Sequence, residues 1–240
     1  MEVQQTFYEP PQTLTLSRWR AQMPPDFEFT LKAWQLITHE ASSRTYRRLR
    51  TRLAPGEAPE CGAFRWTEII QRAWTRTLEC ARLLHATAVL FQCPASFRPT
   101  SQNLENMRRF FREIGPTPAL RYLWEPRGEW DGALVESLCR ELDLTHVVDP
   151  FKARHAWPPD FVYYRLHGVT GARHVYSDEE LRQLAERLPR EGTAYVLFNN
   201  LPRFEDARCF QRLITPEPAP ERPRERPRRG SALPPRRSAP

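Results

Sequence analysis

Apolar and polar residues alternate along seven short segments of the chain, in the pattern of β-strands. Between and after them lie longer stretches in which apolar residues recur every three or four positions, as on one face of a helix. The predicted strands are residues 2–7, 27–33, 87–92, 119–125, 144–149, 161–167 and 194–199. The predicted helices lie near residues 14–22, 40–53, 66–84, 101–114, 130–142, 178–188 and 203–213. Regular alternation of strand and helix predicts a parallel sheet, either open or closed into a barrel.

The faces of the predicted strands favour the closed barrel. In the strand at 27–33, Phe29 and Leu31 share one face, whereas Thr30 and Lys32 share the other. Helices cover the outside of a barrel, so the large apolar face should point outward and Lys32 inward, near the carboxyl end of the strand. The same two-residue count puts a polar residue at the inward carboxyl end of almost every strand. These residues are Lys32, Gln92, Glu125, Asp149, His167 and Asn199.

This arrangement predicts a shared pocket, because active sites of such barrels form where the carboxyl ends of several strands meet. Lys32 is notable for a second reason. Of the 36 basic residues, only Lys32 and Lys152 are lysines. An ammonium group differs from a guanidinium in that its pKa shifts readily on burial. An ion-pair layer that plugs the barrel mouth is the structural alternative.

The composition places much of the positive charge at the C-terminus. The net charge is +7, and residues 216–240 contribute seven arginines and three glutamates to it, or +4. This segment is rich in proline and has almost no large apolar residues, so we expect a disordered tail. Such a tail could bind nucleic acid through weak phosphate contacts, or could be a solvated extension.

Several classes of protein are disfavoured. The chain has no run of about 18 apolar residues and no signal-peptide pattern, which argues against a membrane protein. Its five cysteines are scattered and never spaced as Cys-x-x-Cys, so we expect reduced thiols and a cytoplasmic location. Neither a glycine-rich phosphate loop nor a Gly-x-Ser-x-Gly elbow is present, which disfavours the nucleotide-binding and hydrolase families that use them.

Taken together, the segments resemble the YecE-like family, also called domain of unknown function 72, over residues 2–214. The matching stretches are 2–8, 25–33, Ile37-Thr38-His39, Leu90-Phe91-Gln92-Cys93-Pro94, 124–130, Tyr164-Arg165-Leu166-His167-Gly168, Tyr176 and 195–200. The resemblance implies a TIM-barrel-like fold, but it supplies no activity.

The chain departs from the family pattern in three places. Family members open with a strand–helix unit containing Gly-Trp-Tyr, so we expect a TIM-like (β/α) barrel of seven units in residues 1–215 with the first unit missing. Either the start codon is placed late, or the barrel is open beside its first strand. Gln4 replaces an asparagine. Pro126 separates Glu125 from Arg127 and could re-aim Arg127, because proline fixes the local backbone.

The predicted pocket suits acid–base chemistry on an anionic, phosphate-containing substrate.

 We expect hydrolysis or another acid–base reaction on such a substrate. The predicted catalytic residues are Lys32, Glu125, Asp149 and His167. The predicted ligand-holding residues are His39, Gln92, Arg127, Trp130, Arg165, Tyr176, Asn199 and Asn200. Lysine and arginine would hold the anion, a carboxylate would act as general base, and a histidine would act as acid.

Four other interpretations stay open at the level of sequence. His39, Glu125, Asp149 and His167 could hold a divalent metal, although their spacing fits no metal motif. Glu125 and Asp149 could be the carboxylate pair of a retaining glycosidase. Lys32 could form a Schiff base. The protein could also be a non-catalytic module that binds a ligand, or binds nucleic acid through the basic run 44–52 or the tail.

Overall fold

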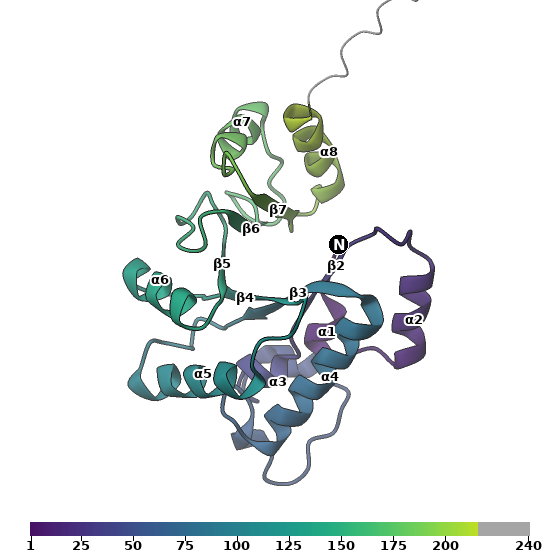
Figure 1. The fold of residues 1–240 in the computed structure, drawn as a ribbon, viewed down its shortest axis with the longest axis vertical. Coiled ribbons are helices and arrows are strands. Elements are labelled where there is room, and N and C mark those ends of the chain that lie inside the picture. Colours follow the sequence, from purple (N-terminus) through teal and green to yellow (C-terminus); the bar gives the residue numbers. More distant parts are fainter. Residues whose placement is uncertain (216–240) are drawn as a thin grey trace, which may run out of the picture.

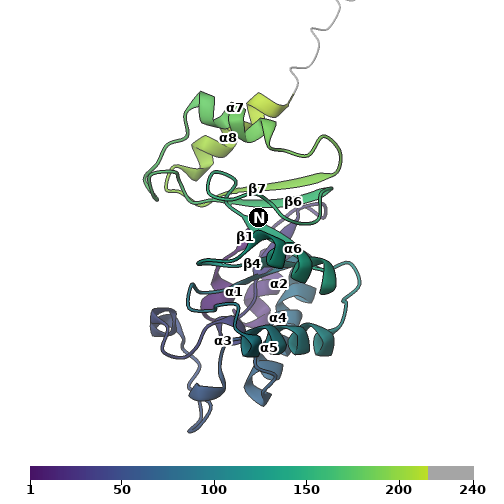
Figure 2. The same cartoon turned by 90° about the vertical axis from the view of Figure 1, so that its left-hand side faces the viewer.

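The computed structural model describes residues 1–215, and the predicted tail at 216–240 lies outside the described residues. Within 1–215, seven parallel strands pair in chain order and curl into a nearly closed barrel, with the helices outside it (Figures 1 and 2). The strands are β1 (Glu2–Val3), β2 (Phe29–Lys32), β3 (Ala86–Gln92), β4 (Arg121–Glu125), β5 (Thr145–Val148), β6 (Phe161–Leu166) and β7 (Thr193–Phe198). This confirms the predicted seven-stranded TIM-like barrel.

A helix or pair of helices follows every strand except β5, which leads into β6 without one. The helices are α1 (Gln5–Tyr8), α2 (Thr13–Ala21), α3 (Gln35–Thr38), α4 (Glu68–Leu84), α5 (Ser101–Ile114), α6 (Gly132–Glu141), α7 (Asp178–Glu186) and α8 (Arg203–Ile214). Two short 3-10 helices, η1 (Arg44–Arg48) and η2 (Ala58–Glu60), lie between α3 and α4. In the part of the chain described, no helix combines the length and apolar character needed to cross a membrane.

The predicted strand faces are correct. Phe29, Leu31 and Trp124 point outward into the core between the strands and helices such as α4 and α5. The opposite faces meet inside the barrel, where Ala88, Leu90, Leu123, Val147 and Tyr163 form a second, smaller core. A third core joins β5–β7 to α7 and α8. The polar ends of the inward faces therefore converge on the carboxyl-end mouth of the barrel.

Side-chain caps fix the start of three helices that follow strands. Thr100 accepts a hydrogen bond from the Asn103 N–H at 3.2 Å, and Asp131 accepts one from the Leu134 N–H at 3.0 Å. Ser177 and Glu180 form the capping box that begins α7. Because α5, α6 and α7 begin at the carboxyl-end side of the sheet, these caps also fix the loops around the barrel mouth.

Two predicted elements are wrong. The strand expected at 2–7 ends at Val3, and residues Gln5–Tyr8 form a helical turn. The Thr6 hydroxyl donates to the Lys32 carbonyl at 2.7 Å, and the Phe7 side chain is buried, so tertiary contacts decide the local conformation. The helix expected at 40–53 is irregular apart from η1, because its exposed arginines leave no continuous apolar stripe to bury.

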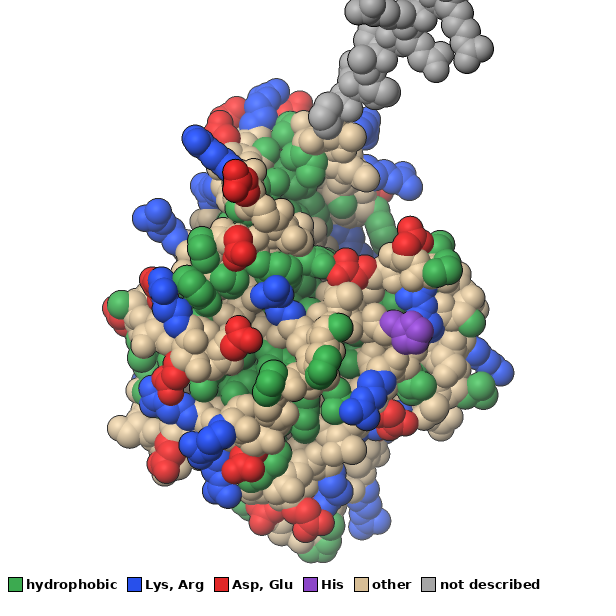
Figure 3. Space-filling model, viewed as in Figure 1, with side chains coloured by type: hydrophobic (Ala, Val, Ile, Leu, Met, Phe, Trp, Pro, Cys, Tyr) green, Lys and Arg blue, Asp and Glu red, His purple; other side chains and the backbone are tan. Residues whose placement is uncertain are grey.

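The barrel is open between its first and last strands. Among residues 1–215, β1 pairs only with β2, and β7 pairs only with β6. A groove of about 870 Å³ lies between them, lined by apolar side chains that include Trp19, Met23 and Phe204. Both ribbon views place the amino terminus beside β7 (Figures 1 and 2), and Figure 3 shows a hollow between the regions of α8 and α2.

Candidate functional site

A cavity of about 470 Å³ opens at the carboxyl ends of β4, β5 and β6, and we call it the β4–β6 cavity. Its lining combines two carboxylates with several basic and aromatic groups. The lining residues are Glu125, Pro126, Arg127, Gly128, Trp130, Gly132, Val135, His146, Val147, Val148, Asp149, Lys152, Ala153, Arg154, Ala156 and His167. Five predicted site residues, Glu125, Arg127, Trp130, Asp149 and His167, are therefore brought together here.

A buried polar network lies behind this cavity, inside the barrel mouth. At its centre is Arg165, which is 3% exposed and donates to Glu2 at 2.9 Å and to Glu125 at 2.5 Å. The Gln92 side-chain oxygen accepts hydrogen bonds from Arg165 at 3.2 Å and from Lys32 at 3.0 Å. The predicted residues Lys32, Gln92 and Arg165 thus converge with one another, and Glu125 connects them to the cavity.

Arg127 links Glu125 to His167. Its Nη2 lies 2.7 Å from Glu125 Oε1 and 3.1 Å from His167 Nε2. Since a guanidinium only donates, His167 Nε2 is assigned here as the acceptor and Nδ1 as the protonated nitrogen. That Nδ1 faces Asp149 Oδ2 at 3.8 Å, and the His167 backbone N–H donates a hydrogen bond to the same oxygen at 3.2 Å. Asp149 therefore holds the His167 backbone and places its negative charge beside the ring.

Both carboxylates of the cavity stay ionised. Burial by itself would raise the pKa of Glu125, but the positive charges of Arg165 and Arg127 lower it overall. Burial likewise opposes the charge of Asp149, but the nearby His167 ring and the hydrogen bond from the His167 backbone N–H bring the net pKa below its usual value. At neutral pH neither carboxylate carries a proton to donate.

Burial shifts two cationic groups near the mouth toward their neutral forms. It lowers the pKa of Lys32 to about 8, and the neighbouring Arg165 charge adds to the shift. The pKa of His146, on the cavity wall, falls to about 4 through burial and the nearby His155. Lys32 also lies over the Phe7 ring, 4.0 Å from its centroid, which partly replaces the lost hydration.

The cavity offers more hydrogen-bond donors than acceptors. Arg127 Nε and Trp130 Nε1 are buried and have no hydrogen-bond partner within the described chain. Lys152 Nζ lies 3.7 Å from Asp149, and its side chain is 55% exposed. Because Glu125 already pairs with Arg165, the remaining charge of the lining is positive. These features suit a ligand that is anionic and rich in acceptors.

The other predicted residues lie elsewhere. His39 is buried, contacts the Thr38 hydroxyl through Nδ1 at 2.8 Å, and has its pKa lowered to about 4, chiefly by burial. Tyr176 accepts a hydrogen bond from the Gly168 N–H at 3.0 Å, and Asn200 donates to the His174 carbonyl at 2.8 Å, so both hold loops in place. Asn199 lines the groove between β1 and β7.

The suggested metal ligands do not assemble. His39 is outside the β4–β6 cavity lining that contains Glu125, Asp149 and His167. Among residues 1–215, no three histidine, cysteine or acidic side chains are grouped so that they could hold a metal ion.

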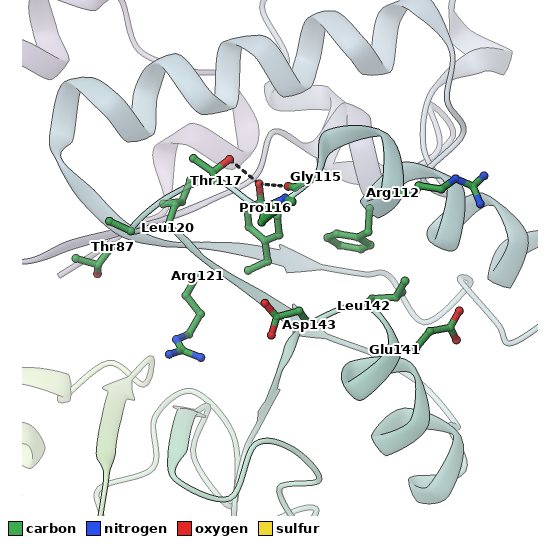
Figure 4. A pocket seen from close by; sticks show the side chains of 13 residues that line it. Thr87, Arg112, Gly115, Pro116, Thr117, Leu120, Arg121, Glu141, Leu142 and Asp143 are labelled. Carbon is green, nitrogen blue, oxygen red and sulfur yellow. Dashed lines mark hydrogen bonds between the residues drawn. The ribbon is translucent and has the colours of Figure 1, made fainter.

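A further cavity of about 750 Å³ lies at the opposite end of the sheet, near the first residues of β3 and β4 (Figure 4). The Tyr122 hydroxyl donates to the Gly115 carbonyl at 2.9 Å and contacts Thr117 at 2.8 Å in its wall. Barrel enzymes place their chemistry at the carboxyl end, so the β4–β6 cavity is the candidate site.

Sequence reasoning missed four residues at the mouth: Glu2, His146, Lys152 and Arg154. Glu2 faces inward by strand parity, but the carboxyl-end rule excluded it. Lys152 lies three residues after Asp149 and is the second of the two lysines. That position and its rarity were the signal by which the sequence could have identified it. His146 has outward parity, and nothing in the sequence marks it as part of the wall.

Comparison with known proteins agrees with the barrel fold. A family model described as protein of unknown function DUF72 matches residues 1–228. The chain belongs to this family. No curated protein matches the chain.

Two solved structures of the family have the same fold. A DUF72 family protein from Enterococcus faecalis V583 is 17% identical, with a TM-score of 0.61 over 88% of this chain and 84% of that one. Another, from Thermotoga maritima MSB8, is 24% identical, with a TM-score of 0.60 over 88% of this chain and 83% of that one. The membership confirms the resemblance noted in the sequence and leaves the activity of the site to its geometry.

Proposed function

We propose that the protein binds a small, phosphate-containing anion in the β4–β6 cavity and hydrolyses it by acid–base chemistry. The observation that carries the proposal is the lining itself. It contains Arg127, Lys152 and the unpaired Trp130 Nε1 together with His167, whose backbone N–H donates to the Asp149 carboxylate. Arginine and lysine match phosphate oxygens in charge and hydrogen bonding.

In this proposal, the phosphoryl group binds Arg127 and so releases Nε2 of His167. Nε2 accepts a proton from a water molecule while the water oxygen bonds to phosphorus. The bond between phosphorus and the leaving oxygen breaks, and the imidazolium returns its proton to that oxygen. Asp149 faces Nδ1 at 3.8 Å and stabilises the imidazolium.

The sequence suggested a carboxylate as general base and a histidine as acid, whereas in this proposal His167 takes both roles and the other predicted catalytic residues support it. Glu125 holds Arg127 in place at 2.7 Å, and its own charge is held by Arg165. Lys32 lies outside the lining, so its part is electrostatic: it shares Gln92 with Arg165 and adds positive charge behind the cavity. A Schiff base at Lys32 is disfavoured because that side chain is only 4% exposed.

A retaining glycosidase is the weaker enzyme hypothesis. Such an enzyme needs a carboxyl group whose raised pKa keeps it protonated as general acid. Glu125 and Asp149 both have lowered pKa values, so neither is suited to that role.

A non-catalytic binding barrel is the second candidate, and one observation favours it. The predicted residues Gln92, Glu125 and Arg165 hydrogen-bond chiefly to one another and to Glu2, so they stabilise the barrel mouth. Under this hypothesis the cavity binds phosphate but turns over no phosphoester.

The test is hydrolysis of p-nitrophenyl phosphate and bis-p-nitrophenyl phosphate, with inorganic phosphate as competitor. We expect His167→Gln to lower kcat at least 100-fold with little change in KM, and Arg127→Gln to raise KM and weaken phosphate inhibition. The matched control is Arg109→Gln, an exposed arginine on α5. Turnover that survives His167→Gln would contradict the mechanism, and phosphate binding that survives Arg127→Gln would contradict the site.

A further inference from the structure

The long connection between α3 and α4 carries closely spaced positive charges. Residues 41–56 contain five arginines and no acidic residue. The five are Arg44, Arg47, Arg48, Arg50 and Arg52, all exposed, and we call residues 44–52 the arginine segment. None of them pairs with an acidic side chain of residues 1–215, whereas Arg65, Arg72 and Arg108 each pair with a glutamate.

The arginine segment is fixed by hydrogen bonds to other parts of the chain. The Glu9 carboxylate accepts hydrogen bonds from the backbone N–H groups of Arg50 and Thr51 at 3.0 and 3.1 Å. The Tyr46 hydroxyl donates to the His39 carbonyl at 2.8 Å. These hydrogen bonds fix the backbone of the segment, whereas its arginine side chains are exposed to water. A surface arranged in advance loses less entropy when a partner binds.

The arginine segment lies on the carboxyl-end side of the barrel. It follows β2 and α3 in the chain, and Glu9, which ties it down, follows β1 and α1. Figure 2 shows the connection between α3 and α4 protruding at the lower left of the molecule.

We propose that the arginine segment binds nucleic acid through its phosphate backbone. Closely spaced guanidinium groups pair with successive phosphates, and their charge drives binding by counterion release. A membrane surface fits less well, because such surfaces insert apolar side chains. Leu49 and Leu53 are half-buried and pack against the core, and none of the exposed large hydrophobic residues lies in the segment. The proposal does not depend on the hydrolysis proposed above.

The test uses the full chain and measures fluorescence anisotropy of labelled 20-nucleotide RNA and duplex DNA across a salt series. The variant is Arg44→Gln/Arg47→Gln/Arg50→Gln/Arg52→Gln; Arg48 is left because it stacks on Tyr8 at 3.5 Å. The control, Arg82→Gln/Arg109→Gln/Arg190→Gln/Arg208→Gln, removes the same charge from exposed positions. We expect the variant to bind at least tenfold more weakly and to reduce the slope of log K against log salt by about 3, with little change in the control.

Three results would overturn the proposal: no binding by the unaltered protein, equal loss in variant and control, or binding to phosphatidylserine vesicles without binding to nucleic acid. A third protein, in which the seven arginines of residues 216–240 are glutamines, separates the tail from the segment. The four-arginine effect must persist in that background. An unchanged melting temperature shows that each variant is folded.

Discussion

Arg165 is the residue on which the barrel mouth depends most. Its guanidinium lies between the carboxylates of Glu2 and Glu125, and all three side chains are nearly inaccessible to water. Removing one member of such a network leaves the opposite charge buried without a partner, which costs more than the intact network contributes.

We therefore predict that Arg165→Met lowers the free energy of unfolding by about 3–5 kcal/mol, measured by urea denaturation. The triple variant Glu2→Gln/Glu125→Gln/Arg165→Met should recover most of that loss, because no unpaired charge is left. A loss below about 1 kcal/mol in the single variant would show that the network does not hold the mouth together.

Lys32 gives a prediction at alkaline pH. Its pKa is about 8 in the folded protein and returns to its ordinary value of 10.5 on unfolding. Between these values the unfolded chain binds the extra proton, so stability should rise with pH.

From pH 7.5 to 9.5 we expect the unfolding free energy to rise by about 1–2 kcal/mol relative to Lys32→Met, which lacks the titrating group. Denaturation of both proteins across this range measures the difference. Parallel pH profiles would mean that Lys32 is not a buried cation.

At the scale of elements, strand parity was the most informative signal. It correctly placed Lys32, Gln92 and Glu125 on inward faces, because one face of each strand had to meet the helices. It could not show that Gln5–Tyr8 turns into a helix, since that depends on the Thr6 contact with the Lys32 carbonyl. It also could not predict the ion pair between Arg165 and Glu2 across the barrel. That pair depends on the length of the side chains rather than on sequence spacing.

Helix α2 gives a second element-scale prediction, because Leu16 is its only buried residue. Leu16→Ala should cost about 2–5 kcal/mol of stability and accelerate amide hydrogen exchange in α2 more than in α4. The control is Leu14→Ala on the same helix, which is 61% exposed and should change stability little. Equal effects of the two variants would contradict the assigned packing.

At the scale of the whole molecule, buried neutral histidines set the response to acid. The pKa values of His39 and His146 both fall to about 4, chiefly through burial. Between pH 6.5 and 4 the unfolded chain takes up protons that the folded protein does not, so stability falls as the pH falls.

Each of these histidines should lower the free energy of unfolding by about 2 kcal/mol between pH 7 and pH 5. This is a large part of the stability of a typical domain. His39→Gln should flatten the acid side of the stability profile by that amount, whereas His85→Gln, at an exposed position, should leave it unchanged. Thermal or urea unfolding at both pH values measures the effect. An equal acid response in the two variants would contradict the buried, neutral state of His39.

The site as a whole was only half predictable. The ring of strand ends located the barrel mouth, but the structure divides that ring into a buried network and an open cavity. The division arises because Arg165, inside the barrel mouth, forms an ion pair with Glu125. Arg127 and His167 then line the open cavity.

The most direct test of the central claim is an NMR titration of the protein labelled with ¹⁵N-histidine, using inorganic phosphate. If the β4–β6 cavity binds phosphate through Arg127, the His167 ring resonances, assigned with His167→Gln, should shift saturably as Arg127 leaves Nε2. The His85 resonances should stay in place, and Arg127→Gln should abolish the shift. His167 resonances that do not respond to phosphate, or that respond equally in Arg127→Gln, would contradict the account.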